Sequence, residues 1–377
     1  MLKTFEAHMD VLWGFLIAAG VVLALTPAVA RAARVLGVID EPGEGRRIHR
    51  TPVPRLGGVA LLLAIMVPSL AFLDLSGPYR GILIGAAIAC GVGLVDDFRG
   101  LPWWAKLLGQ LGAAAAPVGF GVTLDRFTFP FVGIHTLPAW VAVAVTIVWI
   151  VAVIDIVNFL DGMDGLAAGV GGIAAATFAV IALSLGKPEA AVLSAIVAGA
   201  CFAFLRHNFY PARIFMGDSG ALLLGFTLAT IPIQGLLKTA AVAALFLPLV
   251  VLLVPIIDTS FVVAKRLKYG QPIYQADAWH LHHRFANIGF SQRRTVVYLW
   301  TWCLVLAGAA LATRFVPFRQ HGHWNLWPTV VVGLIGFVAV ATSAYIVVLL
   351  EILKLRRIRG WGIWRREAER RRERHVA

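Results

Sequence analysis

Long apolar stretches recur along the whole 377-residue chain, and they constrain its fold more than any other feature. A helix that crosses a bilayer needs about 20 predominantly apolar residues. The sequence therefore predicts an all-α fold, a polytopic transmembrane helical bundle of about 11 spans. The candidate spans are residues 11–30, 57–75, 81–95, 106–122, 138–157, 166–184, 189–205, 219–234, 240–264, 295–313 and 326–350.

The composition favours one membrane-embedded unit over a soluble domain with an anchor. Charged residues make up 14% of the chain, whereas a soluble domain carries about 25%. We expect a single transmembrane domain over residues 1–350 and a basic tail over residues 351–377.

The distribution of basic residues predicts the orientation. With 11 spans, 26 of the 33 Lys and Arg residues fall on the loops that share a side with the C-terminus. Basic loops stay in the cytoplasm, so we expect a cytoplasmic C-terminus and an N-terminus outside. Because topology accounts for the net charge of +13, no nucleic-acid partner is predicted.

Unusual polar residues collect on this cytoplasmic side. Asp96 and Asp97 follow the third span, and adjacent carboxylates need a cation or a shared proton unless they are solvated helix-end acids. Asn158, Asp161 and Asp164 are spaced three apart, so on a helix they would form one stripe. Such an oxygen-rich set suits Mg²⁺, although a glycine-rich turn is the alternative.

A third polar segment runs from Asn208 to Ser219. Asp218 and Ser219 open the eighth span, where the free N–H groups of a helix N-terminus favour anions. Asp218 could alternatively cap that helix. Phe215 is a candidate stacking platform for a base, or an interfacial packing residue.

The histidine-rich loop carries His280, His282 and His283, followed by Arg284. It lacks cysteine and an HExxH pairing, so phosphate binding is favoured, with metal binding and loop packing as alternatives.

Another loop, residues 46–58, is basic and contains His49 and Arg55 together with a Pro and Gly-Gly pattern that a positive-inside flank does not explain. Asp258 follows Pro255 and is the one convincing acid inside a span, a functional or a structural residue.

Four of these motifs, GLVDDFRGL, NFLDGMDGLAAG, RIFMGDSGALLLG and HLHHRF, resemble the polyprenyl-phosphate N-acetylhexosamine-1-phosphate transferase superfamily, of glycosyltransferase 4 type. The resemblance runs from about Asp40 to Arg294. The loops RRIHRTPVPRLGG and DAWHLHHRFANIGFSQRRTV are similar to the WecA/TagO-like branch. The peptidoglycan branch typically has a third histidine where this chain has Arg284.

The resemblance implies an enzyme that transfers GlcNAc-1-phosphate from UDP-GlcNAc to undecaprenyl or a related polyprenyl phosphate and releases UMP. This reaction begins a cell-envelope polysaccharide pathway, such as lipopolysaccharide or teichoic acid biosynthesis. The implied cofactor is Mg²⁺, with Mn²⁺ as an alternative. The implied location is the bacterial inner (plasma) membrane, with the active site on its cytoplasmic face; a homodimer stays open.

The resemblance also carries roles onto matching residues. Asp96 would deprotonate the lipid phosphate, or Asp96 or Asp97 would be a nucleophile. The implied catalytic residues are Asp96, Asp97, His282 and His283, and the implied metal ligands are Asp218, Asp161 and Asn158. The implied substrate-binding residues are Asp164, Asn208, Phe215, Lys106, His280, Arg284, His49 and Arg55.

Two alternatives remain at this point. The donor could be UDP-MurNAc-pentapeptide or another UDP-HexNAc. A divalent-cation transporter would also use acid clusters, but it predicts acids deep within several spans and access from both faces.

Overall fold

The structure is a computed structural model of the chain. It describes residues 2–41, 52–129, 133–235, 289–316, 319–320 and 323–343, and isolated positions at 252–254, 256–257, 259–260, 266 and 345. Most of the predicted ninth span and all of the basic tail lie outside the described residues, as do His49 and Asp258.

Helices occupy the other ten predicted spans. They are α1 (Leu2–Val35), α2 (Gly57–Phe72), α3 (Pro78–Arg99), α4 (Trp103–Gly119), α5 (Ala139–Leu160), α6 (Leu166–Ser184), α7 (Pro188–Asn208), α8 (Gly217–Gly235), α12 (Gln292–Phe315) and a helix over Leu326–Ser343. Within the described ranges, 7 helices are long and apolar enough to cross a membrane, and α2, α4 and α8 are not among them. The chain is therefore a mostly helical, multi-pass membrane protein.

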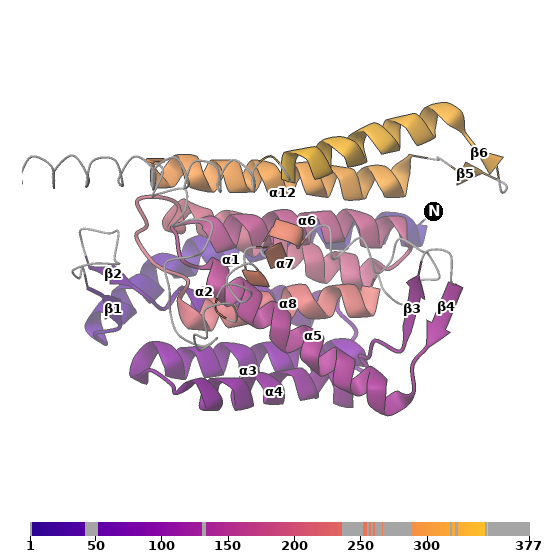
Figure 1. Ribbon diagram of the computed structural model, residues 1–377. Coiled ribbons are helices and arrows are strands. Elements are labelled where there is room, and N and C mark those ends of the chain that lie inside the picture. The colour runs from indigo at the N-terminus through magenta and orange to yellow at the C-terminus, as the bar shows by residue number, and fades with distance from the viewer. Residues whose placement is uncertain are drawn as a thin grey trace, which may run out of the picture.

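Short strand pairs lie at both ends of the bundle (Figure 1). At one end β1 (Ile39–Asp40) pairs antiparallel with β2 (Val53–Pro54). The pairs at the other end are β3 (Arg126–Phe129) with β4 (Gly133–Thr136), and β5 (Arg319–Gln320) with β6 (His323–Trp324). The start of α1 lies at this second end, opposite β1 and β2.

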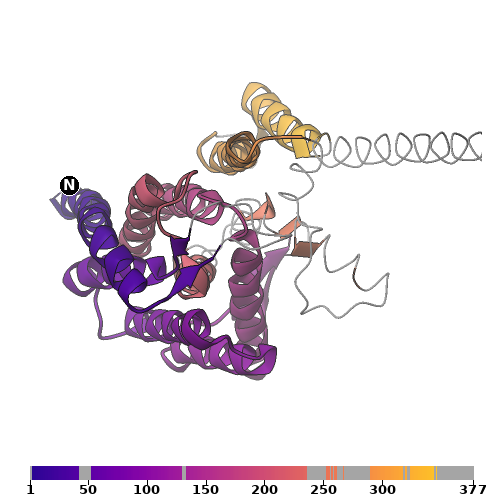
Figure 2. The same cartoon turned by 90° about the vertical axis from the view of Figure 1, so that its left-hand side faces the viewer.

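Helix α8 runs through the middle of the bundle, which Figure 2 shows from the end that carries β1 and β2. It packs against α2, α3, α5, α6 and α7, and all its residues are buried except Asp218 and Gln234. A helix that is apolar all round suits such a site. Gly93 of α3 permits close contact, because a side chain there would collide with the main chain of Asp218 and Ser219.

A separate pair of helices lies along one flank of the bundle, beside α6 (Figure 1). These are α12 and the helix over Leu326–Ser343, which are tied together where the indole of Trp302 donates to the Ser343 hydroxyl at 2.8 Å. The polar site described next belongs to the main bundle.

Candidate active site

Five predicted polar residues meet where four helices begin or end at one end of the bundle. Asp96 and Asp97 lie in the last turn of α3, and Lys106 lies in the first turn of α4. Asn158 lies near the end of α5, and Asp218 lies in the first turn of α8. Helix ends thus carry side chains that are distant in sequence into one polar centre.

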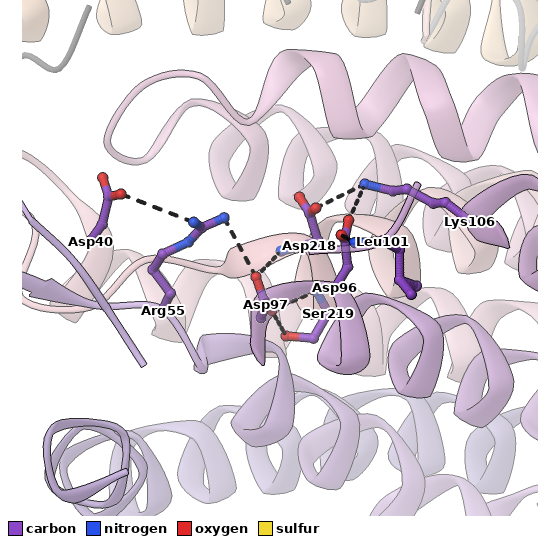
Figure 3. A network of polar contacts seen from close by, with 8 residues as sticks. All are labelled: Asp40, Arg55, Asp96, Asp97, Leu101, Lys106, Asp218 and Ser219. Carbon is purple, nitrogen blue, oxygen red and sulfur yellow. Dashed lines mark hydrogen bonds and ion pairs between the residues drawn. The ribbon is translucent and has the colours of Figure 1, made fainter. Parts of the chain in front are cut away.

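Lys106 links the acids of this centre (Figure 3). Its Nζ lies 2.8 Å from Asp96 Oδ2 and 2.8 Å from Asp218 Oδ2. With the Asn158 amide turned so that its nitrogen donates to Asp218 Oδ1 at 3.1 Å, its oxygen accepts from Lys106 Nζ at 3.2 Å. The Asp96, Lys106 and Asp218 side chains are 11%, 17% and 27% exposed, so the centre is partly open. Charge-assisted hydrogen bonds of this kind are strong and fix geometry.

Asp97 has different partners from Asp96, and its side chain is 0% exposed. Its Oδ1 accepts from the Asp218 N–H at 2.9 Å, and its Oδ2 accepts from the Ser219 N–H at 3.0 Å and the Ser219 hydroxyl at 2.8 Å. Arg55 lies 3.6 Å from Oδ1 and also reaches Asp40 at 4.0 Å (Figure 3). Asp97 therefore caps the start of α8 from a neighbouring helix, a place where N–H groups otherwise lack partners.

The aspartates of the 158–164 motif do not form the predicted single stripe, and that expectation was wrong. Helix α5 ends before Asp161, which is its C-terminal cap. Asp164 is buried and accepts from the Ala212 N–H at 2.9 Å. The physical reason is the glycine-rich turn: Gly165 has a left-handed φ of 78° and starts α6 in a new direction.

Asn208 also uses its amide inside the protein. Its oxygen accepts from the Gly165 N–H at 3.0 Å, its nitrogen donates to the Ile214 carbonyl at 3.0 Å, and the residue is 2% exposed. The Phe215 main chain pairs with Pro54 at 2.8 Å and Gly57 at 3.0 Å, which joins this segment to the basic loop. Asn208 and Asp164 thus hold two turns together beside the centre.

Asp161 is disfavoured as an anion. Burial, and then the negative charges of Asp218 and Asp97, raise the pKa of Asp161 well above its usual value. A cation placed nearby would relieve this repulsion.

The donor atoms fit a magnesium ion that is shared with a substrate. Within the described ranges no three His, Cys, Asp or Glu residues are placed to hold a metal by themselves. Mg²⁺ in phosphate-handling sites is usually held by one or two carboxylates together with substrate phosphates and water. The carboxylates of Asp161 and Asp218 and the amide of Asn158 carry oxygen atoms of the kind that Mg²⁺ prefers.

Part of the predicted site lies outside the described residues, namely His49, His280, His282, His283 and Arg284. The segment that follows the histidine loop is described. Arg293, at the start of α12, donates to the Tyr210 carbonyl at 3.3 Å, and its guanidinium lies 5.5 Å from the centroid of the Tyr210 ring. This contact ties the beginning of α12 to the turn that follows Asn208.

The sequence analysis missed one polar pair beside the centre. Gln110 of α4 donates to Asp155 of α5 at 2.7 Å. The view of Asp258 as the one convincing acid inside a span was therefore wrong, because Asp155 lies within α5. The signal was available, since residue 155 falls inside the predicted span 138–157.

Comparison with known proteins identifies the family. The sequence model of glycosyl transferase family 4 matches residues 79–236, from α3 to α8. A probable undecaprenyl-phosphate N-acetylglucosaminyl 1-phosphate transferase of Bacillus subtilis is 35% identical over 314 residues, which cover 82% of this chain and 86% of that protein. The chain belongs to glycosyl transferase family 4.

Two further similar proteins indicate the branch to which the chain belongs. A decaprenyl-phosphate N-acetylglucosaminephosphotransferase of Mycobacterium leprae is 34% identical over 82% of this chain and 85% of its own length. A phospho-N-acetylmuramoyl-pentapeptide-transferase of Desulforudis audaxviator is 35% identical over 73% of this chain and 88% of its own length. These similarities confirm the superfamily and the WecA/TagO-like branch.

Proposed function

We propose that this chain transfers GlcNAc-1-phosphate from UDP-GlcNAc to undecaprenyl phosphate or a related polyprenyl phosphate. The products are UMP and polyprenyl-diphospho-GlcNAc, the first intermediate of a cell-envelope polysaccharide. The observation that carries the proposal is the partly exposed Lys106 ammonium between Asp96 and Asp218. Membership of a glycosyltransferase family argues against the transporter alternative.

In the proposed reaction an oxygen of the lipid phosphate attacks the phosphorus that bears the sugar. The bond from that phosphorus to the UMP oxygen breaks, so one P–O bond forms and one breaks. Asp96 accepts the proton of the lipid phosphate monoester. It is suited to this role because its carboxylate is partly exposed, while that of Asp97 is closed off against α8. Asp97 is then a positioning residue and not a nucleophile.

The barrier to this reaction is repulsion between two anions, and catalysis consists largely of positioning and charge stabilisation. Lys106 supplies a positive charge at the centre, and Asn158 holds its ammonium toward Asp218. We propose that the histidine loop with His282 and His283 adds donors for the phosphates.

We propose that Asp218, Asp161 and Asn158 hold Mg²⁺, or Mn²⁺ in its place. When bound, the ion neutralises the donor diphosphate and polarises its phosphorus–oxygen bonds. Asp97 keeps Asp218 in place for this purpose through its hydrogen bonds to the start of α8.

We further propose that the protein has about 11 spans in the bacterial plasma membrane, with this centre on the cytoplasmic face. The biased distribution of Lys and Arg supports this orientation, and the start of α1 lies at the opposite end of the bundle (Figure 1).

The test is UMP release by the purified protein with Mg²⁺, in the presence and absence of undecaprenyl phosphate. We expect release with UDP-GlcNAc only when the lipid phosphate is present. Release only with UDP-MurNAc-pentapeptide would move the protein to the other branch, and release with neither donor would refute the proposed reaction. An Asp218→Ala variant that unfolds like the wild type but releases no UMP would support the assignment of this centre.

A further inference from the structure

A second polar contact joins α4 to α5 on the membrane side of the centre. The carboxylate Oδ1 of Asp155 accepts from the amide of Gln110 at 2.7 Å, and Gln110 is 2% exposed. An acid inside a spanning helix is costly, and such residues are retained mainly where they have a partner and a function.

The spacing of this pair relates it to the catalytic centre. Gln110 follows Lys106 by four residues on α4, and Asp155 precedes Asn158 by three residues on α5. Residues three or four apart lie on the same face of a helix, one turn of about 5.4 Å from each other. The two helices are therefore joined twice, by Lys106 with Asn158 at the centre and by Gln110 with Asp155 one turn deeper.

Lys106 needs such support because its side chain is long and flexible, with a large rotamer entropy. Its ammonium contacts Asp96 and Asp218, whose helices α3 and α8 are held together by Asp97. The hydrogen bonds and the ion pair of Asp97 described above run to the start of α8 and to Arg55, which lie outside α4 and α5. The packing of α4 on α3 and of α5 on α8 places the two helices, and contacts between α4 and α5 are needed to fix their register directly against each other.

We propose that Gln110 and Asp155 are positioning residues, which fix α4 against α5 so that Lys106 and Asn158 point at the acidic centre. Gln110 is too buried to contact substrate, and Asp155 is engaged by its amide, so the pair is assigned a role through Lys106. The kinetic part of this inference rests on the proposed function.

The main test compares Asp155→Leu with wild type in the UMP release assay, per mole of folded protein. We expect kcat to fall about 10- to 100-fold, the scale expected when a catalytic group is misplaced by about 1 Å. The KM for the UDP-sugar should change less than about three-fold. Asp155→Asn keeps an acceptor oxygen for Gln110 and should recover most of the lost kcat.

Two further comparisons separate positioning from a general loss of structure. In a Lys106→Arg background Asp155→Leu should lower kcat by no more than about two-fold, because residues that act through one another are not additive. Ser194→Ala removes a buried hydroxyl that donates to the Ala190 carbonyl within α7, and it should leave kcat unchanged. An unchanged kcat in Asp155→Leu, or an equal loss in both backgrounds, would overturn the inference.

A measurement without substrate distinguishes failure of this inference from failure of the proposed function. Lys106 should be acetylated by acetic anhydride several times faster in Asp155→Leu than in the wild type, as followed by mass spectrometry of the Lys106 peptide. Equal labelling rates would refute the positioning role even if the wild type released no UMP. If Lys106 is labelled faster in Asp155→Leu but the wild type releases no UMP, the positioning role stands and only the proposed reaction is rejected.

Discussion

Replacing Asp97 by Asn should lower the thermal stability of the folded protein, because Asp97 supports the start of α8 and does not take part in the chemical step. Each oxygen of Asp97 accepts from the start of α8, and Arg55 lies beside Oδ1. An amide has one acceptor oxygen, so in either orientation it leaves one set of these donors unpaired, and it removes the closer of the two carboxylates beside Arg55. Each buried N–H or O–H donor left unpaired costs about 1–3 kcal/mol. The Arg55 side chain is 35% exposed, so loss of its ion pair adds little. Together these losses correspond to a fall in Tm on the order of 10 °C.

The assay is thermal unfolding in detergent, followed by tryptophan fluorescence. Ser219→Ala removes one of the three donors and should cost only about 1 kcal/mol. Asp96→Asn is the matched control, because it neutralises the adjacent carboxylate, which is partly exposed and has other acids nearby. We expect that variant to keep its Tm within a few degrees while losing UMP release. If Asp97→Asn unfolds at the wild-type temperature, the assignment of Asp97 as the cap of α8 is refuted.

Three other changes test the centre. Lys106→Gln should lower kcat at least 100-fold with little change in Tm, since it removes the charge that faces Asp96 and Asp218, and UMP release per folded enzyme measures this. Because burial and nearby acids raise the pKa of Asp161, the metal-free protein should lose stability as the pH rises above about 4. Asp161→Asn should weaken this dependence of Tm between about pH 4 and 8. Identical Tm profiles for the variant and the wild type would contradict the prediction. Gly93→Ala should cost about 1–3 kcal/mol and also reduce turnover, because its methyl group would displace the start of α8, and a Tm equal to that of wild type would argue against the close packing.

Much of the helical fold could be predicted from the sequence, because long apolar stretches have few alternatives in a bilayer. The helices at the ten described candidate positions confirm this. The short helix α4 and the central helix α8 show what hydropathy does not predict. Hydropathy cannot distinguish a helix enclosed by other helices from one that faces lipid, and α8 is enclosed.

The candidate site was predictable in its membership but not in its geometry. Sequence spacing identified Asp96 and Asp97 as a pair, yet Asp96 faces the open centre and Asp97 faces the start of α8. Adjacent residues on a helix point about 100° apart, so two neighbouring residues of one motif can contact different partners and have different roles. Asp164 was expected beside Asp161, but the turn at Gly165 directs it to Ala212. Three-dimensional packing decides which polar atoms remain for a substrate.

The enclosure of α8 has a consequence for inhibitor selectivity. Gly93 lets α3 contact the main chain at Asp218, so the position of that carboxylate is set by backbone packing and is insensitive to changes in the surrounding loops. Transferases of both branches share about a third of their residues with this chain. A compound that binds at Asp218 and Lys106 should therefore meet atoms whose positions are fixed by helix packing. A compound that binds the surrounding loops instead should be more sensitive to differences in sequence between these transferases.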